Sequence, residues 1–131
     1  MWKVQDTEEG GAQAVELYSF APCFRREQKP DAVTALSFAP VPFDQDVAIL
    51  ALGLESGRIE IWKVPLSAED SSVQPTLVLN VDPFLCHIAT VTKLAWRPHR
   101  AADVDASQEE VSLVLASSSM DHGCRIFEIS W

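Results

Sequence analysis

The sequence has no long hydrophobic run. Apolar residues make up 47% of the chain, yet no stretch approaches the roughly 20 consecutive apolar residues that a membrane-spanning helix needs. The opening residues, 1–6, lack the basic-then-apolar layout of a secretion signal. We therefore expect no membrane association and no export, and the high apolar content predicts a packed core.

Positive charge is also scarce. Ten Lys and Arg residues stand against nineteen Asp and Glu residues, which gives a net charge of −9. Because nucleic-acid modules are typically basic, we expect no direct contact with nucleic acid. The acids lie between the apolar runs, at residues 6–9, 44–46, 69–70 and 103–110. This placement favours solvated loops over an acidic docking face.

Cysteines are few, and none are closely spaced. Cys23, Cys86 and Cys124 form an odd, widely separated set, which predicts reduced thiols and a cytoplasmic or nuclear location. Cys86 with His87, and His122 with Cys124, are conceivable metal ligands. Zinc sites, however, usually show two tightly spaced ligand pairs. We therefore expect Cys86 and Cys124 to be small buried residues, and we expect no metal and no cofactor.

A helical stripe of apolar residues is missing as well, and short runs of Val, Ile, Leu and aromatic residues take its place. Residues 47–52 are apolar throughout, which predicts a central strand covered on both faces. Polar and apolar residues alternate over 58–64, which predicts one buried face. The predicted fold class is all-β. The expected strands are 15–20, 33–38, 47–54, 58–64, 76–81, 91–96, 111–117 and 124–129.

One phrase occurs twice in the chain. Residues 33–40, VTALSFAP, return as residues 91–98, VTKLAWRP. An apolar run, a glycine-containing turn and a strand ending in an aromatic residue follow each copy. That aromatic residue is Trp62 in the first copy and Phe127 in the second. Self-similarity of this kind predicts stacked copies of one supersecondary unit.

The repeated unit resembles the WD40 repeat. In that family His precedes Val-x-x-Leu-x-Phe/Trp-x-Pro, and an Ala-Ser-rich strand and Ser-x-Asp-x-x-Ile-Arg-x-Trp follow. The second copy matches with His87, then residues 91–98, then Ser117 and Asp121. The first copy keeps the apolar framework and Gly57, but it has Lys29 where the His belongs and Ser56 where the Asp belongs.

The WD40 resemblance implies roles for particular residues. In the family, His, Ser/Thr, Asp and Trp form a buried hydrogen-bonded tetrad, so His87, Ser117 and Asp121 are the expected members here. Phe127 occupies the Trp place and has no N–H to donate, which leaves the group three-membered. We expect Phe38, Trp62, Trp96 and Phe127 to fill the core between blades, and Gly57 to form a turn.

The resemblance also implies a division of the chain into propeller blades. Residues 1–28 would end one blade with a third-strand tail and an outer strand. Residues 29–81 would form a complete four-stranded blade, and residues 82–131 a last blade that lacks its outer strand. The chain is thus expected to be a β-propeller fragment whose remaining blades are partners in folding.

Other chemistry is weakly indicated. Residues 53–57, GLESG, differ from a nucleophile elbow because the Ser stands one place late and in a hairpin. His87 with Asp121 would suit a catalytic pair, but the WD40 pattern already accounts for both residues. Arg25, Arg26 and Lys29 form the only local basic cluster, which we interpret as a solvated loop rather than an RNA contact.

The function implied by the resemblance is that of a non-catalytic scaffold. A closer resemblance, over residues 29–129, is to a WD40 subunit of a complex that modifies the wobble uridine of certain tRNAs. It implies that the partners are the largest subunit and the catalytic subunit of that complex. The alternative is a WD40 adaptor that binds peptides, for example in a ubiquitin ligase, which would need Arg or Lys at the mouth of the ring. A propeller enzyme is a third reading.

Overall fold

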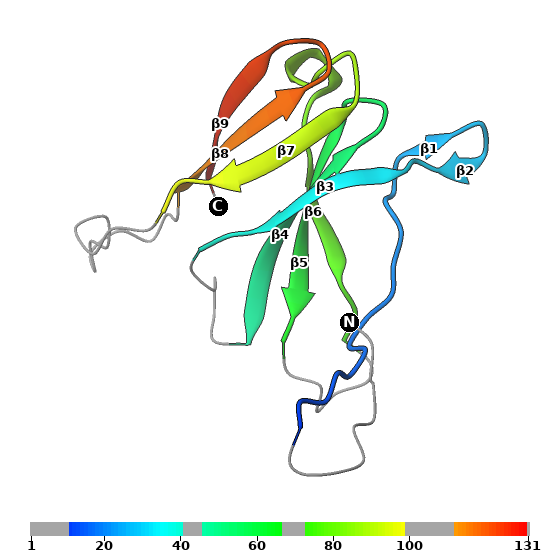
Figure 1. Ribbon diagram of the computed structural model, residues 1–131, viewed down its shortest axis with the longest axis vertical. Helices are drawn as coiled ribbons and strands as arrows, with labels where there is room; N and C mark the ends of the chain where they lie inside the picture. Colours follow the sequence, from blue (N-terminus) through cyan, green and yellow to red (C-terminus); the bar gives the residue numbers. More distant parts are fainter. Residues whose placement is uncertain (1–10, 41–45, 67–72, 99–111, 131) are drawn as a thin grey trace.

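The fold is all-β, as predicted. The computed structural model describes residues 11–40, 46–66, 73–98 and 112–130. These residues form a two-stranded, a four-stranded and a three-stranded sheet, and their single helical element is the 3-10 turn η1 (Pro83–Leu85). Figure 1 shows the three-stranded sheet crossing above the four-stranded one, with the small hairpin to one side. No helix in this part of the chain has the length and hydropathy to span a bilayer.

The four-stranded sheet is an antiparallel meander. Its strands are β3 (Val33–Phe38), β4 (Val47–Leu54), β5 (Ile59–Pro65) and β6 (Thr76–Asn80), in that order. Strand β4 is buried on both faces, which confirms the prediction from its unbroken apolar run. The prediction of one buried face for residues 58–64 is wrong, because Glu60 is fully buried as well as its apolar neighbours.

The three-stranded sheet repeats the first three strands of this meander. It contains β7 (Val91–Trp96), β8 (Ser112–Ser119) and β9 (Cys124–Ser130). Strand β8 continues two residues beyond the predicted end and pairs Ser118 with Cys124, so the turn before β9 is short. Among the described residues, no strand pairs with the outer edge of β9.

The two sheets pack face to face through β7, which lies against β3 and β4. Gly53 permits this approach, since a Cβ there would lie only 2.8 Å from the Cβ of Val91. Thr34 donates a hydrogen bond to the Val91 carbonyl at 2.6 Å, and the Trp96 indole N–H donates to the Ser37 carbonyl at 2.9 Å. The core between the sheets consists of Ile49, Ala51, Ile59, Ile61, Val81, Cys86, Val91, Leu94, Trp96, Leu115 and Ile129.

A second apolar cluster covers the opposite face of the four-stranded sheet. It contains Leu50, Leu52, Leu54, Trp62 and Val64, and Tyr18 and Phe24 pack against it. The prediction of a strand at residues 15–20 is wrong: this segment has no strand pairing. Its aromatic side chains instead lie on the sheet, and the Phe20 and Trp62 ring centroids are 4.7 Å apart.

The sequence patterns missed one hairpin. Strands β1 (Arg25–Arg26) and β2 (Lys29–Pro30) pair antiparallel around Glu27 and Gln28. Both turn residues have positive φ, 54° and 67°, a conformation that usually calls for Gly, Asn or Asp. Because this turn lacks the usual residues, the sequence carries no hairpin signal there.

Candidate functional site

The structure brings His87, Ser117 and Asp121 together at one end of the three-stranded sheet. His87 Nδ1 lies 3.0 Å from Asp121 Oδ2, and Nε2 lies 2.7 Å from Ser117 Oγ. The Asp121 carboxylate can only accept, so Nδ1–H donates to it, and Nε2 shares the second hydrogen bond with the Ser117 hydroxyl. The His87 side chain has no exposed surface, and Ser117 is 2% exposed.

Local backbone geometry positions the acid of this group. Asp121 sits in the β8–β9 turn, where its Oδ1 accepts from Gly123 N at 2.8 Å and its own N–H donates to Ser119 Oγ. Its Oδ2 also accepts from Ile88 N at 3.3 Å. Asp121 therefore joins the turn to the connection that leads into β7.

The pKa of Asp121 is lowered from its ordinary value of 3.8. Partial burial acts to raise it and is the largest single influence. The hydrogen bonds from Gly123 N, the His87 ring and Ile88 N act the other way, and together with the charge of His87 they prevail. Asp121 is thus ionised near neutral pH and can only accept hydrogen bonds.

The arrangement matches the order of a Ser-His-Asp triad, but it has no access for a substrate. A catalytic serine must reach a carbonyl in a pocket and have donors for the developing oxyanion nearby. Ser117 and His87 are instead buried between strands, and Ser119 Oγ beside them donates to the Ala89 carbonyl at 2.9 Å. What this geometry can do is hold the β6–β7 connection against the β8–β9 turn.

The conceivable metal ligands are not brought together. The prediction that both cysteines are buried is confirmed for Cys86 and is wrong for Cys124, which is exposed. Burial raises the pKa of the Cys86 thiol, although its backbone hydrogen bond and the charges of Arg58 and Arg125 act to lower it. No cluster of three or more potential ligands occurs in the described ranges.

The first repeat uses different polar residues at the corresponding place. Lys29 and Ser56, which replace the family's His and Asp, do not contact each other. Instead Asp31, which is 5% exposed, accepts from Ser56 N at 3.1 Å and from Ala32 N at 3.0 Å. The Ser56 hydroxyl itself has no hydrogen-bond partner within the described residues. Sequence reasoning missed Asp31 because it looked for the family's residues at the family's spacing.

Glu60 is the second polar residue that the sequence reasoning missed. Its carboxylate is fully buried and accepts three hydrogen bonds, from Cys23 N at 3.0 Å, Phe24 N at 2.8 Å and Trp62 Nε1 at 2.9 Å. The Arg58 guanidinium lies 4.1 Å from the centre of the Phe24 ring. Glu60 therefore fixes the segment before β1 to the face of the sheet. An acid in an apolar strand, two places before a Trp, was the available signal.

The aromatic residues divide between three environments. Trp96 lies between the two sheets, and Phe127 packs partly buried against the same core. Trp62 is buried on the opposite face of the four-stranded sheet. The prediction for Phe38 is wrong: it is 52% exposed, at the end of the edge strand β3. Gly57, with φ of 97°, forms the expected turn.

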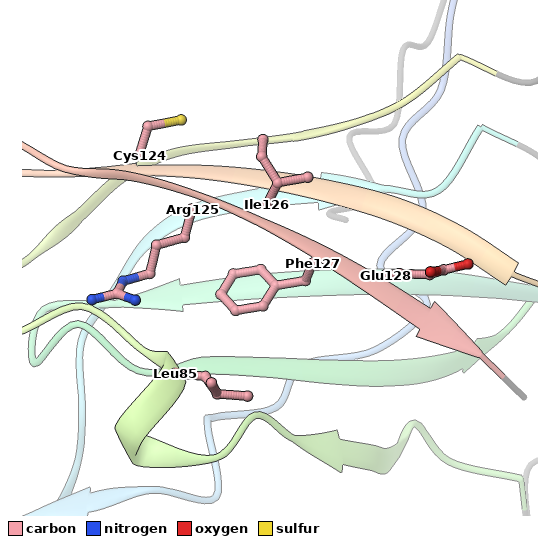
Figure 2. Close-up of a pocket in the computed structure, with 6 residues that line it drawn as sticks. All are labelled: Leu85, Cys124, Arg125, Ile126, Phe127 and Glu128. Carbon is pink, nitrogen blue, oxygen red and sulfur yellow. The ribbon is translucent and has the colours of Figure 1, made fainter.

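A hollow of about 510 Å³ lies beside the free edge of β9. Leu85 of η1 and the consecutive residues 124–128 line it. Figure 2 shows Arg125 and Phe127 on the side of β9 that faces Leu85, and Cys124 and Ile126 on the opposite side. The polar residues described above, His87, Ser117, Asp121, Asp31 and Glu60, do not line this hollow.

Comparison with known proteins gives one consistent result. The chain is 30% identical over 103 residues to Elongator complex protein 2 of Arabidopsis thaliana and 31% identical over 105 residues to that of Danio rerio. Each match covers 76% of this chain. A third, to the protein of Schizosaccharomyces pombe, is 34% identical over 71 residues and covers 54% of this chain.

The chain resembles Elongator complex protein 2. This agrees with the closer resemblance that residues 29–129 carry, which is to Elongator complex subunit 2. The chain spans about an eighth of the length of the Elongator complex protein 2 relatives from Arabidopsis and Danio. No family model matches the sequence.

Proposed function

We propose that the chain is part of a WD40 β-propeller that serves as a non-catalytic scaffold of the Elongator complex. In this proposal its sheets are blades, residues 29–81 a complete one and residues 82–131 one without its outer strand. The scaffold supports modification of the tRNA wobble uridine through protein–protein contacts, in the cytoplasm and nucleus. Its partners are the largest subunit and the catalytic subunit.

The observation that carries the proposal is that the buried polar residues join loops to one another. His87, Ser117 and Asp121 hold a connection to a turn, and Asp31 does the same in the first repeat. The three side chains that match the order of a catalytic triad are thereby engaged in holding loops at one end of the sheet. Rigid loops on a β scaffold are well suited to docking other proteins. The similarity to Elongator complex protein 2 supplies the assembly.

Affinity purification tests this proposal. The protein that contains this chain is tagged in its own cells, and we expect the largest and the catalytic Elongator subunits to be recovered with it, as identified by mass spectrometry. The Ser117→Ala variant should recover less of both, because it weakens the fold, whereas Lys93→Glu on an exposed strand position should recover the same amount. Recovery of neither subunit with the unaltered protein would refute the assignment.

The same purification separates the alternatives. A peptide-binding WD40 adaptor would bring down ubiquitin-ligase subunits in place of Elongator subunits. A propeller enzyme would show turnover that the His87→Ala and Asp121→Ala variants abolish while the protein stays folded.

A further inference from the structure

The β1–β2 hairpin concentrates positive charge in an acidic chain. Four of the ten Lys and Arg residues belong to it or to its base, namely Arg25, Arg26, Lys29 and Arg58. Arg26 and Lys29 are directly paired across the two strands, and both are exposed. Like charges placed opposite each other destabilise a strand pair. Neither side chain forms an ion pair with a described residue, so nothing in this part of the chain offsets the repulsion.

The hairpin also contains strained backbone. Glu27 and Gln28 both lie in the left-handed region of backbone conformation. This conformation is unfavourable in free energy for any residue other than glycine. These two residues reverse the direction of the chain, and this places Arg26 beside Lys29. The Arg25 guanidinium donates to the Gln28 carbonyl at 3.2 Å, which holds the turn closed.

The base of the hairpin is firmly attached to the four-stranded sheet. Asp31 N donates to the Phe24 carbonyl at 3.0 Å, and the Asp31 side chain accepts from Ser56 N. Phe24 N donates to Glu60, and Arg58 lies over the Phe24 ring. The cations are therefore presented on a fixed support, which lowers the entropy that binding would otherwise cost.

Two of the acids near the hairpin are buried beneath this surface and engaged in hydrogen bonds. Asp31 and Glu60 lie beneath it, buried, with their oxygens accepting backbone or indole N–H bonds. Glu27 in the turn is the one exposed acid on the hairpin itself. Glu55 is exposed at the base, where its N–H donates to the Ala32 carbonyl at 2.9 Å, so the positive charge of this surface is concentrated at the Arg26 and Lys29 end of the hairpin.

We propose that the β1–β2 hairpin, through Arg26 and Lys29 with Arg58 at its base, docks a short acidic segment of a partner protein. The size of the patch favours a peptide over a nucleic acid. A duplex presents about one charge per 1.7 Å, and useful affinity for it requires many phosphate contacts. Two adjacent cations engage one or two carboxylates. No exposed aromatic residue lies on the hairpin to stack a base, as single-strand binding would need.

The experiment measures binding of the full chain to a fluorescent decamer of glutamate by anisotropy. A decamer of glutamine and an unstructured oligoribonucleotide of ten residues serve as comparison probes. We expect the glutamate decamer to bind more tightly than either comparison probe, and Arg26→Glu with Lys29→Glu to weaken that binding about tenfold or more. Raising the salt should weaken it as well, because the contacts are exposed.

A matched control keeps the net charge equal. Lys93→Glu with Arg125→Glu makes the same change in charge at exposed positions of the other sheet. We expect this control to bind the decamer like the unaltered chain, and circular dichroism verifies that both variants fold. Equal loss in both double variants, tighter binding of the oligoribonucleotide, or no binding of the glutamate decamer each overturns the proposal. Because the probes are synthetic, the result does not depend on the Elongator assignment.

Discussion

Each of the two sheets has a junction between two of its loops, and the residue that makes this junction stands on opposite sides of it in the two sheets. In each sheet, an aspartate connects the segment before the first strand to a later hairpin turn. In the three-stranded sheet the aspartate stands on the turn, where Asp121 accepts from Ile88 N in the incoming segment. In the four-stranded sheet it stands on the incoming segment, where Asp31 accepts from Ser56 N in the turn. What is repeated is therefore the junction between loops, and the residue that makes it can change sides.

The sheets differ more in what lies behind this junction. The three-stranded sheet uses Ser117 and His87, which complete the contact to Asp121. The four-stranded sheet instead buries a second carboxylate, Glu60, which holds the preceding segment to its outer face. A buried carboxylate is stable only while all its hydrogen bonds are made. The four-stranded sheet therefore depends more heavily on one residue, Glu60.

The largest expected effect tests this dependence. Glu60→Ala removes the acceptor of three N–H groups, and we expect it to lower the free energy of unfolding by about 3–5 kcal/mol. Urea unfolding followed by tryptophan fluorescence measures the change. Ser117→Ala, which removes one hydroxyl, should cost much less. Equal losses at the two positions would contradict the difference between the sheets.

The next effect concerns the contact that both sheets share. Gly53→Ala places a Cβ against the side chain of Val91, and we expect a loss of about 1–3 kcal/mol from overpacking. Adding Val91→Ala should return part of this loss, because it removes the atoms that clash. If the double variant is as unstable as the sum of the single variants, the two residues do not meet.

A smaller effect is expected where a single hydrogen bond crosses the sheets. Trp96→Phe removes the indole N–H that donates to the Ser37 carbonyl, and we expect a loss of about 1–2 kcal/mol. Calorimetry of the full chain gives the change. Trp62→Phe is the informative companion, since it leaves the sheet contact intact and instead removes one donor to Glu60.

The smallest expected effect is a change in how the free energy of unfolding depends on pH in acidic solution. The lowered pKa of Asp121 means that the unfolded chain binds a proton more readily than the folded one. Its stabilisation is therefore complete well above 3.8, the ordinary value, and is lost as the pH falls through the lower pKa of the folded state. Asp121→Asn should flatten stability against pH in this window, as measured by urea unfolding at a series of pH values. An unchanged profile would show that Asp121 gains nothing from its partners.

The sequence was sufficient for the parts of the fold that depend on repetition. The all-β class follows from patterns that occur along the chain, whereas the order of the strands and the meeting of His87 with Ser117 and Asp121 are what the WD40 resemblance implies. Features that depend on what covers a surface were missed. Nothing in residues 15–20 distinguishes a strand from an extended segment lying on a sheet, and nothing in residues 33–38 indicates that Phe38 is exposed.

The buried acids were hidden for a different reason. The alternation around Glu60 is typical of a half-exposed strand, and only three donors brought from distant residues make its burial tolerable. The β1–β2 hairpin likewise uses Glu27 and Gln28 where turn statistics favour glycine or asparagine. Both cases show tertiary contacts overriding a local preference.

The turn at Gly57 couples the stability of the two sheets. Its carbonyl accepts from His87 N at 3.2 Å, and a Cβ at this position would overlap the His87 carbonyl. The neighbouring Glu55 carbonyl accepts from Thr90 Oγ1 at 3.0 Å. The residues that contact the segment containing His87 from below thus belong to the β4–β5 turn of the four-stranded sheet. Because these contacts are shared, a change that weakens either sheet should also weaken its neighbour by nearest-neighbour coupling.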